Sequence, residues 1–252
     1  MGRLDGKAAF VTGGARGIGR AIVEKFVDEG ASVSFIDLDD EEGSRLARAS
    51  GASFMRADVT VEADIQHAID DLVRERGAID ILVNNAGINA YFDAAEMTEA
   101  EWDRVFAVDL KGAWLCAKHA LRAMKRAGRG SIVNISSIHA TLTMAGMFPY
   151  AAAKSGLVGM TRSLALDFAP LGIRVNAVLP GWTRTRLVEE WFAMQPNPTD
   201  AEAHVLAVHP LRRIATAAEV ANLVAFVASD EASAITGASL PIDCGLGVQF
   251  AT

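Results

Sequence analysis

The stretch Thr12-Gly13-Gly14-Ala15-Arg16-Gly17-Ile18-Gly19 follows a short apolar run and opens a segment of helical periodicity. In a doubly wound α/β sheet, a turn of this kind presents backbone N–H groups to a pyrophosphate. Gly13 permits the tight turn, Gly17 lets the backbone approach a phosphate, and Gly19 lets the helix pack close to the strand. We therefore predict that a dinucleotide binds at this turn, with contacts from Gly13, Arg16, Gly17, Ile18 and Gly19.

Short apolar or β-branched runs alternate with longer helical stretches along the rest of the chain, which is typical of a parallel sheet covered by helices on both faces. The expected strands are Ala8–Thr12, Ser32–Ile36, Ser53–Ala57, Ile79–Asn84, Ser131–Ile135, Arg174–Val178 and Ser239–Ile242. The expected helices are Arg20–Glu29, Glu41–Ala49, Glu62–Arg76, Glu101–Arg126, Tyr150–Phe168 and Ala218–Ala228. We therefore predict one α/β domain over residues 1–252, built on a doubly wound, seven-stranded parallel sheet.

The segment from Gly181 to about Arg213 interrupts this alternation with three prolines, several polar residues and a cluster of large apolar side chains. A long insertion at the end of a strand is more often a functional lid than a mere connection. We predict that residues 181–213 form a lid over the substrate. A surface excursion packed on its neighbours is the alternative.

Composition and charge narrow the class of partner. The chain has 252 residues, of which 51% are apolar and 22% charged, and its formal net charge is −7. This balance supports a buried core and argues against binding to nucleic acid or to an anionic membrane, which requires clustered lysine and arginine. No apolar run is long enough to span a bilayer, and the two cysteines match neither a disulfide framework nor a metal motif. We expect a cytoplasmic protein that binds a small molecule and no metal.

Asp37 follows the second expected strand, about 20 residues beyond the glycine turn. A carboxylate at this position accepts hydrogen bonds from the adenosine ribose hydroxyls and repels a 2′-phosphate. NAD is therefore favoured over NADP. Arg16 is an argument for NADP, because a guanidinium can bind the 2′-phosphate.

Tyr150 and Lys154 lie four residues apart at the head of an expected helix, so their side chains share one face. An ammonium beside a phenol favours the phenolate, which can accept the proton of an alcohol. Tyrosine and lysine at this spacing are common on helix surfaces, so the spacing alone does not establish catalysis.

Three motifs together resemble the short-chain dehydrogenase/reductase family. They are the Gly-x-x-x-Gly-x-Gly turn, Asn84-Asn85-Ala86-Gly87 at the end of the fourth strand, and Tyr150-Ala151-Ala152-Ala153-Lys154. The resemblance covers nearly the whole chain. It implies a Rossmann fold, an NAD(H)-dependent oxidoreductase of alcohols and carbonyls, and a homotetramer assembled through the two longest helices and the C-terminal region. It also implies that Tyr150 is the acid/base and that Lys154 binds the nicotinamide ribose as well.

Ser137 matches the family's catalytic serine by motif and by its spacing from Tyr150, so the resemblance implies that its hydroxyl holds the substrate oxygen. Ser136 is the alternative, although its side chain should point to the opposite face of the strand end.

Further family marks imply further cofactor contacts. Asp58-Val59 resembles the pair that contacts the adenine. Pro180-Gly181-Trp182-Thr183-Arg184-Thr185 resembles the segment in which backbone at Thr183 faces the carboxamide and Thr185 faces the phosphates. The additional implied contacts are Asp58, Val59, Asn85, Ala86, Gly87, Gly181, Thr183 and Thr185.

Asp109 departs from the family pattern. The segment Val108-Asp109-Leu110-Lys111-Gly112 aligns with a family stretch that usually reads Val-Asn-Leu-x-Gly, whose asparagine joins a water relay to the lysine. An ionised carboxylate accepts hydrogen bonds and cannot donate them, so the relay would need reversed waters or a protonated Asp109. We predict a catalytic role for Asp109 beside Lys154. An inert isosteric replacement is the alternative.

Residues that follow the strand ends are placed to line the substrate site. The candidates are Ser137, His139, Asn89, Trp182, Arg184 and Trp191. Polar side chains under an aromatic cover favour a sugar or a polyol as the substrate. The rival function is a 3-oxoacyl-[acyl-carrier-protein] reductase, which commonly uses NADPH, and the non-enzymatic alternative is an NAD(H)-sensing scaffold.

Overall fold

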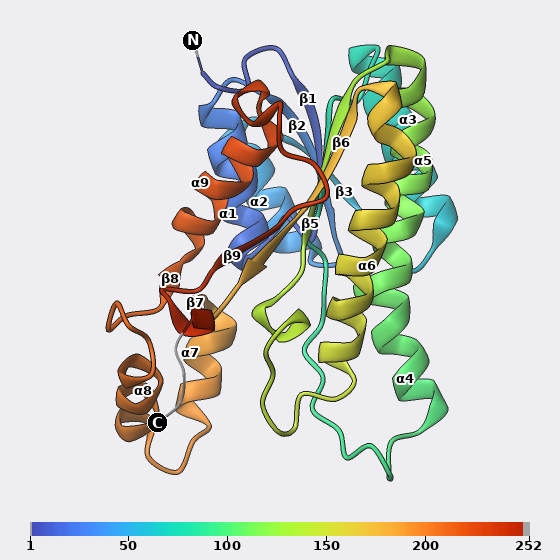
Figure 1. Cartoon of the computed structure of the whole chain (residues 1–252). Coiled ribbons are helices and arrows are strands. Elements are labelled where there is room, and N and C mark those ends of the chain that lie inside the picture. The colour runs from blue at the N-terminus through green and yellow to red at the C-terminus, as the bar shows by residue number, and fades with distance from the viewer. Residues whose placement is uncertain (1, 249–252) are drawn as a thin grey trace.

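A computed structural model describes residues 2–248, and its centre is one parallel sheet. The strands are β1 (Ala8–Thr12), β2 (Ser32–Asp37), β3 (Ser53–Arg56), β4 (Ile81–Asn84), β5 (Gly130–Ile135), β6 (Ile173–Pro180) and β9 (Ser239–Ile242). They form a seven-stranded sheet in the order β3-β2-β1-β4-β5-β6-β9 (Figure 1). The predicted fold class and all seven predicted strands are confirmed.

Two groups of helices cover the two faces of this sheet (Figure 1). One face carries α1 (Gly17–Asp28), α2 (Asp40–Ser50) and α9 (Ala217–Ala228), and the other carries α3 (Glu62–Arg76), α5 (Gly112–Ala127) and α6 (Tyr150–Phe168). Each face buries its own apolar layer against the strands. The continuous burial of β1 between these layers explains why its five residues are all apolar or small.

The structure differs from the sequence prediction in two places. The predicted helix Glu101–Arg126 is interrupted, because α4 (Glu99–Phe106) passes through a π-helical segment, Ala107–Lys111, before α5 begins. The insertion is also more regular than expected. It contains β7 (Thr183–Arg184), α7 (Arg186–Ala193) and α8 (Pro198–Ala207), and β7 pairs with β8 (Ala215–Thr216) in a small parallel sheet.

The strand order determines where a ligand can bind at the edge of the sheet. β1 lies between β2 and β4, so the connections that leave β1 and β4 diverge and open a crevice beyond the carboxyl ends of the strands. The glycine turn, Asp37 and Asn85 all lie at this edge. Within residues 2–248, no helix has both the length and the apolar character required to cross a bilayer.

Candidate active site

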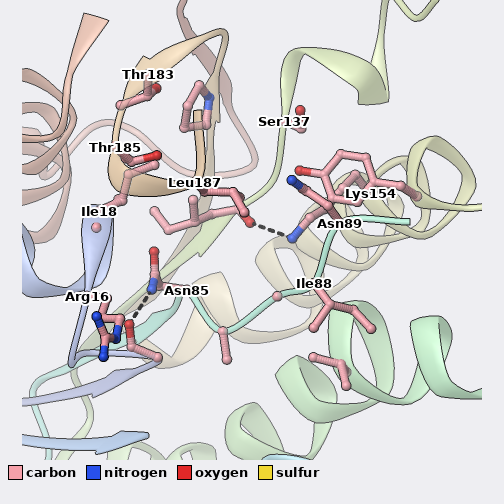
Figure 2. Close-up of a pocket in the computed structure, with 18 of the residues that line it drawn as sticks. Arg16, Ile18, Asn85, Ile88, Asn89, Ser137, Lys154, Thr183, Thr185 and Leu187 are labelled. Carbon is pink, nitrogen blue, oxygen red and sulfur yellow. Dashed lines mark hydrogen bonds between the residues drawn. The ribbon is translucent and has the colours of Figure 1, made fainter. Parts of the chain in front are cut away.

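A cavity of about 800 Å³ lies at the carboxyl ends of the strands and brings together residues that are far apart in the sequence. Figure 2 shows Arg16 and Ile18 on one side of this cavity and Ser137, Asn89 and Lys154 on the other. Most of the predicted site residues line it, namely Gly13, Arg16, Gly17, Ile18, Asp37, Asp58, Val59, Asn85, Ala86, Gly87, Asn89, Ser137, His139, Tyr150, Lys154, Gly181, Trp182, Thr183, Thr185 and Trp191.

The backbone around Gly13 and Gly19 is packed so closely that a side chain at either position would collide with it. Gly13 has a φ of +64°, and a Cβ at this position would lie 2.9 Å from the Cα of Ala86. A Cβ on Gly19 would lie 1.9 Å from the carbonyl oxygen of Gly13. Arg16, the N-cap of α1, makes no side-chain cap, and the first turn holds no acidic residue. No side chain of residues 2–248 therefore caps the first backbone N–H groups of α1, whose residues Gly17 and Ile18 line the cavity. Such free N–H groups at a helix N-terminus fit the pyrophosphate of a dinucleotide.

Asp37 and Arg16 are both held by neighbours at the end of β2. The carboxylate of Asp37 accepts hydrogen bonds from the backbone N–H of Ala15 and of Asp39, each at 3.0 Å. The guanidinium of Arg16 donates to the carboxylate of Asp39 at 2.7 Å and lies 3.7 Å from that of Glu42. The pairing with Asp39 raises the pKa of Arg16, which therefore stays charged. Its charge is directed to these two carboxylates.

Asn85 holds the glycine turn against the end of β4. Its side-chain amide donates to the carbonyl oxygens of Thr12 at 3.1 Å and Gly13 at 2.9 Å. Its backbone N–H donates in turn to the hydroxyl of Thr12 at 3.0 Å. These bonds satisfy polar groups where the strand ladder stops, so the motif fixes the shape of the cavity floor.

The two candidate serines at the end of β5 make different contacts. The hydroxyl of Ser136 donates to the carbonyl oxygen of Lys154 at 2.9 Å and so anchors α6. The hydroxyl of Ser137 accepts from the backbone N–H of His139 at 3.2 Å, which leaves its own O–H available to a ligand. This geometry favours Ser137 over Ser136 as the serine that meets a substrate.

Tyr150 and Lys154 occupy one face of α6, as their spacing predicts. The Nζ of Lys154 lies 5.6 Å from the centre of the Tyr150 ring and donates to the carbonyl oxygen of Ile135 at 3.3 Å. Lys154 is buried, whereas the Tyr150 side chain is half-buried and lines the cavity. A phenol that faces the cavity with an ammonium behind it is arranged for proton transfer to or from a ligand.

Asp109 does not line the cavity but is buried directly behind it, in the π-helical segment. Its Oδ1 accepts a hydrogen bond from the backbone N–H of Ile88 at 2.8 Å, and its Oδ2 lies 3.6 Å from the Nζ of Lys154. Within the part of the chain that the structure describes, Oδ2 has no hydrogen-bond partner. Burial raises the pKa of Asp109, and the ammonium of Lys154 opposes this only in part.

Replacing Asp109 with asparagine is expected to stabilise the protein at neutral pH by about 1 kcal/mol, a common scale for one substitution. A carboxyl group whose pKa is raised by folding binds its proton more tightly in the folded chain than in the unfolded one. The free energy of unfolding therefore falls as the pH rises from the usual aspartate value through the raised one. Thermal or urea unfolding at pH 7 and at pH 4 measures the difference.

The matched control is Asp70→Asn, which removes an exposed carboxylate from α3. We expect the advantage of Asp109→Asn over the parent chain to shrink toward pH 4, while Asp70→Asn shows no such trend. A stability difference for Asp109→Asn that is the same at both pH values would contradict the argument.

Arg184 is not among the residues that line the cavity, and its contact with the substrate stays a prediction. Its guanidinium donates to the carboxylates of Glu189 at 2.8 Å and Glu202 at 2.7 Å. These partners lie on α7 and α8, and the two bonds hold the insertion together. Gly19 does not line the cavity either. It lies where α1 packs against the backbone of the glycine turn.

The sequence prediction missed several apolar residues that line the cavity. They lie in the loop before α6 and on α7, where no motif singles them out, and one follows the Asn85 motif. Their only sequence signal is that each comes soon after a strand end. They are Ile88, Ile138, Met144, Met147, Leu187 and Val188.

The large apolar side chains of residues 181–213 have different positions. Trp182 and Trp191 line the cavity, with ring centres 4.8 Å apart. Phe192 instead packs with Val205 and Ile214 in the apolar core of the insertion, and Met194 is exposed. The role of residues 181–213 as a lid stays a prediction.

A cradle for a dinucleotide and a tyrosine–lysine pair that share one cavity define a nicotinamide-dependent oxidoreductase of the doubly wound α/β class. Comparison with known proteins agrees. The sequence profile of the enoyl-(acyl carrier protein) reductase family matches residues 13–247. The chain is 42% identical to cis-4-hydroxycyclohexanecarboxylate dehydrogenase of Sinomonas cyclohexanicum, over 95% of this chain and 96% of that protein.

Two further proteins are similar over nearly their whole length. One is the 3-alpha-(or 20-beta)-hydroxysteroid dehydrogenase of Mycobacterium bovis, 41% identical over 97% of this chain and 90% of that protein. The other is the ligand-free structure of Thermoplasma acidophilum aldohexose dehydrogenase, with a TM-score of 0.92 and 38% identity over 99% of this chain and 97% of that one. The chain belongs to the short-chain dehydrogenase/reductase family. It is an oxidoreductase of alcohol and carbonyl groups with a nicotinamide cofactor.

Proposed function

We propose that this chain is an NAD-dependent dehydrogenase of a secondary alcohol, with Tyr150 as the group that accepts the hydroxyl proton. The observation that carries the proposal is the convergence of the glycine turn, Ser137, Tyr150 and Lys154 on one cavity. The nicotinamide, when bound, supplies the acceptor for the hydride of the alcohol carbon. Gly13, Gly17 and Asn85 shape the floor on which the cofactor lies.

Four side chains have separate roles in the reaction. The Ser137 hydroxyl holds the substrate oxygen, and the Tyr150 phenolate takes its proton as the carbon becomes a carbonyl. The buried ammonium of Lys154 stabilises the phenolate across the face of α6 and hydrogen-bonds the nicotinamide ribose. Asp109, 3.6 Å from Lys154, fixes the position of that ammonium. The reverse sequence reduces a ketone.

The pairing of Arg16 supports NAD over NADP. A 2′-phosphate would meet the carboxylate of Asp37, while the nearby guanidinium is already directed to Asp39 and Glu42. We therefore propose that Asp39 helps to exclude NADP by holding Arg16.

Replacing Asp39 with asparagine is expected to tighten NADPH binding by about tenfold or more, because a freed guanidinium can bond the 2′-phosphate. Asparagine is also a good N-cap, so it can keep the cap that Asp39 gives to α2 through the N–H of Glu42. Quenching of protein fluorescence by NADH and by NADPH measures both dissociation constants without turnover.

Two further variants separate this effect from a change in net charge. Asp40→Asn removes an exposed charge from the first turn of α2, next to Asp39, and should leave the NADPH affinity unchanged. Adding Arg16→Ala to Asp39→Asn should abolish the gain. A gain that persists without Arg16, or that Asp40→Asn reproduces, counts against the role of Asp39.

The names of the similar proteins suggest a hydroxyl group on a ring as the substrate. The relatives include dehydrogenases of a hydroxycyclohexanecarboxylate and a hydroxysteroid, and the structural neighbour is an aldohexose dehydrogenase. We therefore propose a secondary alcohol on a sugar or carbon ring.

The test is absorbance of the reduced cofactor with purified protein, NAD⁺ or NADP⁺, and a panel of aldoses, polyols, hydroxy acids and secondary alcohols. NADH formation with one of these compounds supports the proposal. NADPH-dependent reduction of a 3-oxoacyl thioester in place of NAD⁺-dependent oxidation would instead favour the acyl-carrier-protein reductase. A chain that binds NADH and turns over nothing would act as a scaffold.

We also propose a homotetramer assembled through α5 and α6. The outer faces of these helices form a groove lined by apolar residues and the stems of basic ones, including Trp114, Leu121, Leu164 and Phe168. Trp114 is 45% exposed in the single chain, a large apolar surface to leave in water. Sedimentation or light scattering of the purified protein gives its mass directly.

A further inference from the structure

The substrate end of the cavity is lined by many apolar side chains, beside the polar groups of Asn89, Tyr91 and His139. Ser137 and Lys154 mark this end in Figure 2, and Leu187 projects between them and Thr185. The surrounding apolar side chains come from the residues beside Ser137, the loop before α6, and the start of the insertion. We call them the apolar wall, and they are Ile88, Ile138, Met144, Met147, Trp182, Leu187, Val188 and Trp191.

Of the polar groups expected to hold a sugar, Arg184 and one ring nitrogen of His139 have partners within the chain, while Asn89 lines the cavity. Arg184 lies outside the cavity in its pairs with Glu189 and Glu202. His139 shares a hydrogen bond between its Nδ1 and the hydroxyl of Thr143 at 3.1 Å. Burial lowers the pKa of His139, so its ring is neutral at pH 7 and brings no charge to the site.

An aldose carries a hydroxyl on nearly every ring carbon, and each one that leaves water needs a hydrogen-bond partner. The methionine, leucine, isoleucine and valine side chains of the wall offer no such partner of useful strength, and its two tryptophans offer one N–H donor each. A ring of saturated carbons loses no hydrogen bonds against the same side chains and gains from leaving water. The apolar wall therefore discriminates by the number of hydroxyl groups on the substrate.

We propose that the substrate is an alicyclic secondary alcohol, a saturated carbon ring whose one reacting hydroxyl meets Ser137 and Tyr150 while its other carbons contact the apolar wall. This inference rests on the proposed dehydrogenase function. The alcohol carbon gives its hydrogen with two electrons to NAD⁺, the hydroxyl proton passes to Tyr150, and a cyclic ketone and NADH leave. The inference revises the expectation of a sugar or polyol.

The test compares kcat/KM with NAD⁺ for cyclohexanol, 4-methylcyclohexanol and D-glucose. We expect the ring alcohols to exceed the aldose by about 100-fold or more, the scale on which apolar pockets discriminate against hydroxyl groups. Turnover of the aldose at an equal or higher kcat/KM overturns the inference and leaves the dehydrogenase function intact. Failure of every compound in the wider panel overturns both.

Leu187→Asn tests whether the apolar wall is the cause. We expect it to lower the ratio of the ring alcohol to the aldose by about tenfold, since it puts an amide where the ring carbons lie. Leu211→Asn is the matched control, because Leu211 belongs to the same insertion and is similarly exposed, 61% against 54%, but does not line the cavity. An unchanged ratio in Leu187→Asn, or an equal change in Leu211→Asn, counts against the apolar wall.

Discussion

Phenylalanine in place of Tyr150 is expected to lower kcat/KM by about 10²–10⁴-fold, the usual contribution of a positioned acid or base. The substitution removes one hydroxyl from the side chain that faces the cavity and leaves the ring in its cluster with Ala90, Val105 and Ala153. It also leaves Lys154 with its contacts to Ile135 and Asp109. The cofactor floor is untouched, so the dissociation constant for NADH should not change.

The chain provides its own control, because its only other tyrosine lines the same cavity. Tyr91 is 55% exposed, so Tyr91→Phe also deletes a phenol hydroxyl near the substrate without disturbing a buried contact. We expect kcat to stay close to that of the parent enzyme in this variant. If Tyr150→Phe kept the parent activity, or if both variants lost activity equally, Tyr150 would not be the acid/base.

The sheet was predictable because its signals are local. Each strand is a short apolar run bounded by polar or glycine residues, as in Ala8–Thr12 before Gly13. Burial on both faces of a parallel sheet requires such runs, and the helices between them follow from their own apolar spacing. The glycine turn was equally visible, since its function depends on residues that lack side chains.

The π-helical segment could not be predicted in this way. A shift of the backbone hydrogen bonds by one residue barely alters the apolar spacing, so 101–126 reads as one continuous helix. The shift has a consequence for the site, because the interrupted segment contains Asp109. The family resemblance indicated that Asp109 lies near Lys154. Only the fold shows that Asp109 is buried and that its Oδ2 has no hydrogen-bond partner among residues 2–248.

The pairing of Arg184 could not be predicted for a similar reason. The residue follows a strand end, which is where ligand contacts gather, and its charge suggested a partner in the cavity. Its real partners, Glu189 and Glu202, belong to two short helices that the irregular composition of the insertion concealed. Apolar side chains such as Met147 and Leu187 were missed for the opposite reason, since nothing in the sequence separates them from ordinary core residues.

Alanine in place of Gly19 is expected to weaken NADH binding by about 100-fold or more, the scale on which a displacement of about 1 Å disrupts a site. The new Cβ would lie 1.9 Å from the carbonyl oxygen of Gly13 and 2.5 Å from the side-chain amide of Asn85. Backbone cannot give way as a flexible side chain can, so α1 and the turn must separate. The N–H groups that face the pyrophosphate then lose their alignment.

Gly159→Ala is the control, because, apart from its chain neighbours and the backbone of α6, no atom of residues 2–248 lies within 4 Å of a Cβ at this position, and alanine favours a helix. Circular dichroism and thermal unfolding establish that each variant is folded before its affinity for NADH is measured. Should Gly19→Ala fail to fold, Gly17→Ala tests the same turn. Its φ of +54° strains a side chain, while among the described residues a Cβ there meets only Thr185, at 3.6 Å. We expect this milder variant to bind NADH at least about tenfold more weakly, because relaxing the φ moves the first N–H groups of α1. Parent affinity in a folded Gly19→Ala, or in Gly17→Ala, would show that the pyrophosphate does not lie on this turn.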